Sequence, residues 1–123
     1  MKNALILFAH GARDPEWAAP MRRVQAAIRA TQPELRVELA FLEFMSPTLA
    51  ECAEGLLADG VDKLTVVPMF IAQGGHLKRD VPLLIEQLRS TGKNVEISLL
   101  PAIGESEIVV QAMAAAALQG AGL

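Results

Sequence analysis

The stretch ALILFAHG, residues 4–11, decides the fold of this chain, because an uninterrupted apolar run stops at a histidine and a glycine. An apolar run of this length that ends at a turn signal is typical of a parallel strand buried on both faces. Comparable runs occupy residues 36–42, 63–69 and 95–100, and a helical pattern follows each of them. This repeated strand–helix unit predicts a parallel sheet with helices on both faces, a three-layer α/β architecture.

The composition of the four runs predicts their order in the sheet. The first and third runs are almost wholly apolar, as central strands should be, whereas the second and fourth carry polar residues such as Glu38 and Glu96. We therefore expect a four-stranded parallel sheet of order 2-1-3-4. Pro68 is unfavourable in a central strand, so we place the end of the paired part of the third strand near Val67.

The helices are predicted from capping residues, prolines and glycines. A polar side chain before the first turn accepts a backbone hydrogen bond, proline suits the first turn, and glycine often ends a helix. The predicted boundaries are Asp14-Pro15 for the first helix, Ser46-Pro47 and Gly60 for the second, Asp80 with Pro82 and Gly92 for the third, and Ser106 for the fourth.

Length and composition restrict the class of protein. A chain of 123 residues, 52% of them hydrophobic, predicts a single domain spanning residues 1–123. No apolar run approaches the roughly 20 residues of a membrane span, and we expect neither a membrane partner nor a signal peptide. A net charge of −3 and the absence of tyrosine argue against a nucleic-acid partner. The single cysteine, Cys52, fits a reducing cytoplasm and is expected in the core.

Three chemically versatile residues stand at equal intervals of 33 residues: His10, Glu43 and His76. Each lies at or shortly after the end of a predicted strand, so parallel strands would gather all three at one rim of the sheet. The order 2-1-3-4 reverses between the first and third strands, and ligands of open α/β sheets bind at such a switch point. Two imidazoles and a carboxylate can bind a divalent metal and can also move protons.

Each of these residues also has a simpler explanation. His10 could cap a strand end through a backbone hydrogen bond, His76 could be exposed on a flexible glycine-rich loop, and Glu43 could be a solvated edge residue. The nearby cations Arg13, Lys78 and Arg79 could pair with anionic groups of a substrate or simply be solvated. The chain has no P-loop and no GxGxxG motif, so nucleotide binding has no support.

The motifs around these residues resemble a known family. HGARDP at 10–15, FLEFMSPTL at 41–49, VVPMFIAQGGHLKRDVP at 66–82 and PAIGES at 101–106 are similar to the small sirohydrochlorin cobaltochelatases, the class II chelatases. The resemblance covers nearly the whole chain. It implies a flavodoxin-like chelatase domain, in the single-domain form that is expected to act as a homodimer with its tetrapyrrole site in a cleft.

The resemblance also implies roles for individual residues. His10 corresponds to a metal-binding proton acceptor, His76 to the second metal-binding histidine, and Glu43 to the acidic residue after the second strand. Two positions depart from the family pattern: Ala12 replaces a frequent serine, and Ser46 stands where some relatives carry glutamate. The positions that match the stretch lining the macrocycle are Ser46, Ile71, Ala72, Gln73, Gly74 and Gly75.

The expected activity is therefore insertion of a divalent metal into sirohydrochlorin, in cobalamin- or siroheme-type biosynthesis. The metal, Co²⁺ before Fe²⁺ or Ni²⁺, is a substrate, and no tightly bound cofactor is expected. Arg13 is expected to contact the tetrapyrrole. One alternative is a non-catalytic carrier of metal or tetrapyrrole, which would need no proton acceptor. Another is a histidine phosphatase, but that class carries arginine where this chain has Ala9.

Overall fold

The sheet has the predicted strands and the predicted order. A computed structural model describes residues 2–91 and 94–123, except for the side chains of His76 and Thr91. All strand pairs are parallel, and the order is β2-β1-β3-β4. The flavodoxin-like architecture of the sheet is thus confirmed. The strands are β1 (Asn3–Ala9), β2 (Arg36–Phe41), β3 (Lys63–Pro68) and β4 (Glu96–Leu99).

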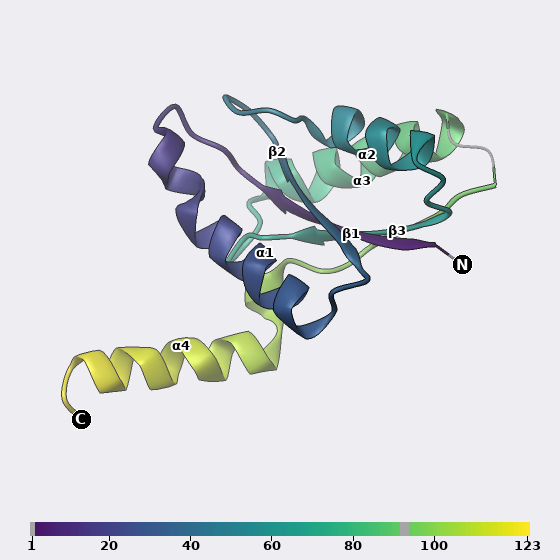
Figure 1. The fold of residues 1–123 in the computed structure, drawn as a ribbon. Helices are drawn as coiled ribbons and strands as arrows, with labels where there is room; N and C mark the ends of the chain where they lie inside the picture. Colours follow the sequence, from purple (N-terminus) through teal and green to yellow (C-terminus); the bar gives the residue numbers. More distant parts are fainter. Residues whose placement is uncertain (1, 92–93) are drawn as a thin grey trace.

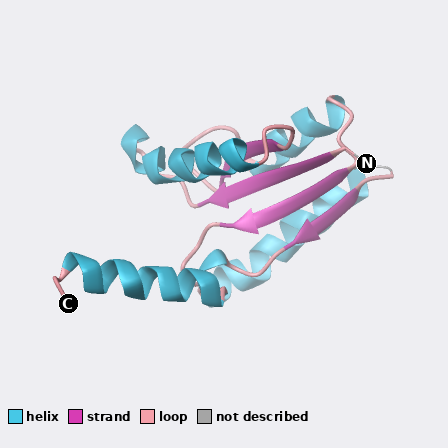
Figure 2. Ribbon diagram, turned by 60° about the horizontal axis from the view of Figure 1, so that its bottom comes forward, coloured by secondary structure: helices cyan, strands magenta, loops and turns pink. Residues whose placement is uncertain are grey.

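Helices cover the sheet unequally. Figure 1 shows α2 and α3 side by side on one face and α1 on the other, while α4 projects away from the sheet. Figure 2 shows the same detachment of α4 from a second direction. The layer on the α1 face is therefore incomplete. The helical elements are η1 (Pro15–Ala18), α1 (Ala19–Thr31), α2 (Leu49–Ala58), α3 (Gly75–Thr91), η2 (Ile103–Glu105) and α4 (Glu107–Gly120), where η marks a 3-10 helix.

Alternation along β1 divides the core between the two faces of the sheet. Ile6 and Phe8 are fully buried in the larger cluster, which α2 and α3 cover. Leu7 packs in the smaller cluster with Val24 and Ile28 of α1. Because β1 is paired on both sides and flanked by helices on both faces, most of its apolar run is buried, as the sequence predicts, and Leu5 stays partly exposed on the α1 face.

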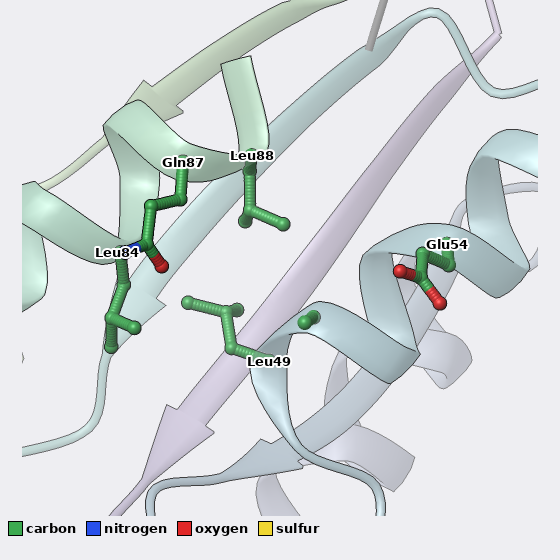
Figure 3. A pocket seen from close by; sticks show the side chains of 6 residues that line it. Leu49, Glu54, Leu84, Gln87 and Leu88 are labelled. Carbon is green, nitrogen blue, oxygen red and sulfur yellow. The ribbon is translucent and has the colours of Figure 1, made fainter. Parts of the chain in front are cut away.

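The seam between α2 and α3 is a packing interface. Leu49 of α2 lies opposite Leu84 and Leu88 of α3 across a small cavity of about 120 Å³, with Glu54 at its margin (Figure 3). Cys52 of the same helix is buried, as predicted, and burial raises the pKa of its thiol to about 11. The thiol is therefore protonated at neutral pH and unreactive.

Two predicted helix starts are wrong. α2 begins at Leu49 and not at Ser46-Pro47, because Thr48 forms a capping box with Glu51 that fixes the first turn there. α3 begins at Gly75, so Asp80 does not cap it and Pro82 lies inside it. The first and fourth helical segments begin as predicted, with Asp14 capping η1 and Ser106 preceding α4.

The ends of β3 and α3 are the remaining predicted boundaries. Pro68 belongs to β3 and pairs with Phe8 of β1, one residue beyond the predicted end of pairing. On the other side of β3, the ladder with β4 already ends at Val66 and Leu99. Proline, which has no N–H to donate, therefore breaks no hydrogen bond to β4. The predicted helix end at Gly92 lies outside the described residues. Within the described part of the chain, no helix is long and apolar enough to cross a membrane.

The capping box of α2 gives a stability prediction. The Thr48 hydroxyl accepts a hydrogen bond from the Glu51 backbone N–H, at 3.2 Å. Thr48→Ala removes this acceptor and should lower the free energy of unfolding by about 1 kcal/mol, measured by urea denaturation. Ser106→Ala is the matched control, because Ser106 precedes α4 without a capping bond from its side chain. An equal loss of unfolding free energy in both variants would contradict the capping role assigned to Thr48.

Candidate functional site

Backbone hydrogen bonds beyond the ends of β1 and β2 hold His10 beside Glu43. The Leu42 N–H donates to the Ala9 carbonyl at 2.9 Å, and the Glu43 N–H donates to the His10 carbonyl at 3.0 Å. These two bonds continue the pairing of the two strands past their last paired residues. The sequence prediction that His10 and Glu43 meet at one rim of the sheet agrees with this arrangement.

Gly11 permits the close approach of the two segments. It has a φ of +90°, and a Cβ placed on it would lie 2.0 Å from the Glu43 carbonyl oxygen. Any side chain at this position would therefore meet backbone in a conformation that L-residues rarely adopt. The glycine after His10 is thus required by the contact between the β1 and β2 termini.

An open cavity of about 570 Å³ lies at this rim. Its walls come from the ends of β1 and β2 and from the start of α3, so it lies at the switch point of the sheet. The cavity combines an imidazole, two carboxylates and apolar side chains. The lining residues are His10, Leu42, Glu43, Gly74, Leu77 and Asp80.

The His10 imidazole rests on an aromatic support and is open to solvent. Its ring meets Phe70 edge to face, with 5.4 Å between the ring centroids. Phe70 is only 6% exposed and makes a similar contact with Phe8 in the core. The contact supports one edge of the imidazole, and His10 as a whole is exposed, as a metal ligand or proton acceptor that meets a substrate requires.

Phe44, which sequence reasoning missed, stands at the same rim. It is 58% exposed and has a φ of +65°, a conformation that costs free energy for a residue with a bulky side chain. The guanidinium carbon of Arg13 lies 5.0 Å from the centre of its ring. This cation–π contact joins the segment after β1 to the segment after β2.

The histidine on α3 is only partly located. His76 is the second residue of α3, and its side chain lies outside the described residues. Asp80 follows it by four residues, so the two positions share one face of the helix, and Asp80 lines the cavity. The sequence prediction of Asp80 as a helix cap is incompatible with this shared face, because Asp80 lies inside α3. Among the described side chains, no three His, Cys, Asp or Glu groups form a metal cluster.

The remaining predicted substrate contacts surround the cavity unevenly. Of the stretch Ile71–Gly75, the lining of the cavity includes Gly74, and Gly75 begins α3. Ile71 is 72% exposed, and Ala72 is also exposed, whereas Gln73 is partly buried. Ser46 is exposed in the segment between β2 and α2, where the Ser46-Pro47 peptide is cis. Of the predicted site residues, the structure therefore brings His10, Glu43 and Gly74 together at the cavity. Ser46, Ile71, Ala72 and Gln73 are not among the residues that line it.

Backbone contacts with η2 hold the loop that follows β3. The Gly104 N–H donates to the Phe70 carbonyl at 3.0 Å. A Cβ on Gly104 would lie 2.0 Å from the Ile71 carbonyl oxygen, so the backbones of η2 and the loop are in direct contact. The position of the loop beside the cavity thus depends on η2.

Comparison with known proteins identifies the family of this chain and supports its fold. The sequence model of the family described as CbiX matches residues 4–119. The chain is 36% identical over 109 residues to a protein of Saccharolobus solfataricus named sirohydrochlorin cobaltochelatase, with 84% of each chain covered. A protein of that name from Sulfurisphaera tokodaii is 34% identical over 107 residues, which cover 87% of this chain and 84% of that one.

Two solved structures are also similar. A CbiX protein of cobalamin (vitamin B12) biosynthesis from Marinobacter aquaeolei VT8 has a TM-score of 0.85 at 28% identity, and 98% of both chains is covered. The sirohydrochlorin chelatase SirB from Bacillus subtilis subspecies spizizenii, in complex with cobalt, has a TM-score of 0.79 at 28% identity. In that comparison, 94% of this chain matches 49% of the other, so this chain spans about half of SirB.

The close approach at Gly11 gives a second prediction. Gly11→Ala should lower the free energy of unfolding by about 2–4 kcal/mol, because the added Cβ strains the backbone and pushes against the Glu43 carbonyl. Gly55→Ala is the control, since nothing lies within 4 Å of a Cβ there and α2 favours alanine over glycine. Denaturant titration measures both. A Gly11→Ala protein as stable as the control would show that the contact is not needed.

Proposed function

This chain belongs to the CbiX family, and we propose that it is a sirohydrochlorin chelatase, an enzyme that inserts a divalent metal into the tetrapyrrole. The observation that carries the proposal is the joint position of His10 and Glu43 on one open cavity at the switch point of the sheet. Curated relatives that share more than a third of their aligned residues with this chain bear the name sirohydrochlorin cobaltochelatase.

The groups at the cavity suit the chemistry of insertion. A tetrapyrrole that accepts M²⁺ releases two pyrrole N–H protons, so the site needs a metal ligand and acceptors for two protons. A neutral imidazole can hold a first-row divalent metal, and an imidazole or carboxylate can take a proton within hydrogen-bond reach. We assign metal delivery to His10 and His76, with His10 also accepting a proton. Glu43 accepts the other proton or completes the coordination of the metal.

The cavity is open enough for a flat substrate to rest on the rim rather than inside the protein. The exposed ring of Phe44 and the Arg13 guanidinium stacked on it offer an aromatic face and a cation beside the cavity. Arg13 can pair with the peripheral carboxylates of sirohydrochlorin, as can Lys78 and Arg79 on α3. Ser46 and the segment from Ile71 through Ala72, Gln73 and Gly74 to Gly75 would border the macrocycle.

Imidazole and carboxylate ligands accept Co²⁺, Fe²⁺ and Ni²⁺ alike, so the donor set alone does not select among these metals. We propose Co²⁺, with the metal acting as a substrate and no tightly bound cofactor. The names of the relatives support this choice, as does the cobalt complex of the structurally similar SirB. The product would then enter cobalamin-type biosynthesis, or siroheme biosynthesis if Fe²⁺ is inserted.

We further propose that residues 1–123 form one chelatase domain that acts as a homodimer in the cytoplasm. The single, buried and protonated thiol of Cys52 suits a reducing compartment. The one sheet of the described residues, at whose rim His10 and Glu43 lie, supports one domain. The exposed apolar surface of α4 supports a second copy as the partner.

The rate of metal insertion tests the roles proposed for His10 and His76. His10→Ala should lower kcat/KM for insertion of Co²⁺ into sirohydrochlorin by about 10²-fold or more, because it removes a ligand and a proton acceptor together. His76→Ala should cause a comparable loss. An anaerobic absorbance assay measures the rates, and thermal unfolding checks that both variants fold. Wild-type rates in His10→Ala would refute the assignment.

Substitution of Glu43 distinguishes a chelatase from a non-catalytic carrier. Glu43→Gln keeps the shape of the side chain but cannot accept a proton, so it should slow insertion while leaving tetrapyrrole binding intact. Glu54→Gln on α2, whose carboxylate lies away from the cavity, is the matched control and should insert metal at the wild-type rate. If Glu43→Gln also inserts metal normally, proton acceptance by Glu43 is excluded.

A further inference from the structure

Phe44 stands at the rim in a backbone conformation that is costly for its residue type. Its φ is +65°, in the left-handed region, and the residue is 58% exposed. A bulky side chain disfavours this region, and an aromatic ring that stays largely in water gains little from burial. The stability of the fold therefore gives no reason for a phenylalanine at this position. Conformational strain of this kind is typical of a functional site.

The backbone is held on both sides of Phe44. Before it, the Glu43 N–H donates to the His10 carbonyl at 3.0 Å. After it, Met45 packs against the apolar cluster that contains the buried Phe41. These two anchors constrain the chain at position 44, where glycine or asparagine would adopt the same φ at lower cost. The segment thus presents an exposed phenylalanine directly beside Glu43 of the cavity.

The guanidinium of Arg13 lies over one face of the Phe44 ring. Its central carbon is 5.0 Å from the ring centroid, and Arg13 is itself exposed. This cation–π contact favours the ring orientation in which it forms. The ring is therefore oriented before a ligand arrives, which lowers the conformational entropy that binding must offset. The ring surface that Arg13 does not cover is apolar and suits a conjugated ligand.

The strand order places His10 between two exposed apolar side chains. Phe44 follows β2, and Ile71, which is 72% exposed, follows β3, whereas His10 follows β1 between them. The strands β2 and β3 are two strand spacings apart, about 10 Å. This separation is comparable with the width of a tetrapyrrole ring. A macrocycle centred over His10 would therefore reach an exposed apolar side chain on either side.

We propose that Phe44 is a substrate-binding residue whose ring packs against the conjugated face of the tetrapyrrole, and that the chain keeps its costly backbone conformation for this contact. The inference rests on the proposed function for the identity of the ligand. A phenyl ring neither holds the metal nor accepts a proton, so the contribution of Phe44 is to binding. Loss of the ring should therefore weaken binding of the macrocycle without slowing the insertion step.

Binding of metal-free sirohydrochlorin separates the aromatic contact from apolar bulk. Phe44→Leu keeps an apolar side chain but removes the aromatic face, and it should raise the Kd about 3–10-fold. Phe44→Tyr keeps the ring and should bind within about twofold of the wild type. An anaerobic absorbance titration measures both. A wild-type Kd in Phe44→Leu, or an equal loss of affinity in Phe44→Tyr, would overturn the proposed contact.

Replacement of Phe44 by glycine tests the strain. Phe44→Gly relaxes the backbone and removes the ring, so the thermal unfolding midpoint should rise by about 2–5 °C while the Kd for sirohydrochlorin rises about 10–100-fold. A lower midpoint in Phe44→Gly would show that the ring stabilises the fold, and an unchanged Kd would show that it does not bind the macrocycle. Either result would overturn the proposal.

Asn94→Gly is the matched control for this substitution. Asn94 also has a positive φ, +62°, but it precedes β4 and so lies at the opposite end of the parallel sheet from the cavity. Asn94→Gly should therefore leave the Kd for sirohydrochlorin unchanged. A loss of affinity as large as that of Phe44→Gly would mean that the effect at position 44 does not come from contact with the ligand.

Steady-state kinetics separate binding from the insertion step. Phe44→Leu should raise the KM for sirohydrochlorin by a factor similar to its effect on the Kd and leave kcat within about twofold. A fall in kcat with unchanged KM would contradict a role in binding. If the wild type binds sirohydrochlorin without inserting metal, the proposed chelatase activity fails and the titrations still decide the role of Phe44. If the wild type inserts metal and Phe44→Leu binds normally, only the role of Phe44 fails.

Discussion

The parallel pairing of β1 with β2 on one side and β3 on the other is the interaction on which the rest of the structure depends. It buries Ile6 and Phe8 on one face and Leu7 on the other, so the sheet and both halves of the core share one strand. The same pairing continues past the strand ends through the bond from Glu43 to the His10 carbonyl. Folding of the sheet therefore assembles the rim of the cavity at the same time.

The rim combines rigid support with exposed chemistry. Phe70 supports the His10 ring from the core, and Gly11 lets the segment after β2 approach closely enough to place Glu43 on the same cavity. The functional groups remain open to solvent, so a flat tetrapyrrole can reach them and a metal can arrive without passing through the protein. At this rim, Phe44 adopts a costly positive φ, and its ring lies beside the Arg13 guanidinium.

Local sequence patterns predicted the parts of this structure that depend on burial and strand periodicity. Polar residues such as Glu38 marked the edge strands, and the position of His10 and Glu43 after strands placed them at one rim. The patterns failed where two local signals competed. Asp80 and Pro82 suggested a helix start, but α3 begins at Gly75, and Asp80 belongs to the cavity instead. The backbone bond from Gly104 of η2 to the Phe70 carbonyl, which ties η2 to the loop after β3, is likewise encoded by no periodicity.

The central claim is that this rim performs metal insertion and does not only bind its ligands. The most direct measurement is an anaerobic absorbance time course of the wild-type protein with sirohydrochlorin and Co²⁺, compared with a protein-free blank and repeated with Fe²⁺ and Ni²⁺. The account predicts metallation faster than the blank, with turnover of many equivalents of tetrapyrrole per chain. Stoichiometric binding of sirohydrochlorin with metallation no faster than the blank would contradict it and would indicate a carrier.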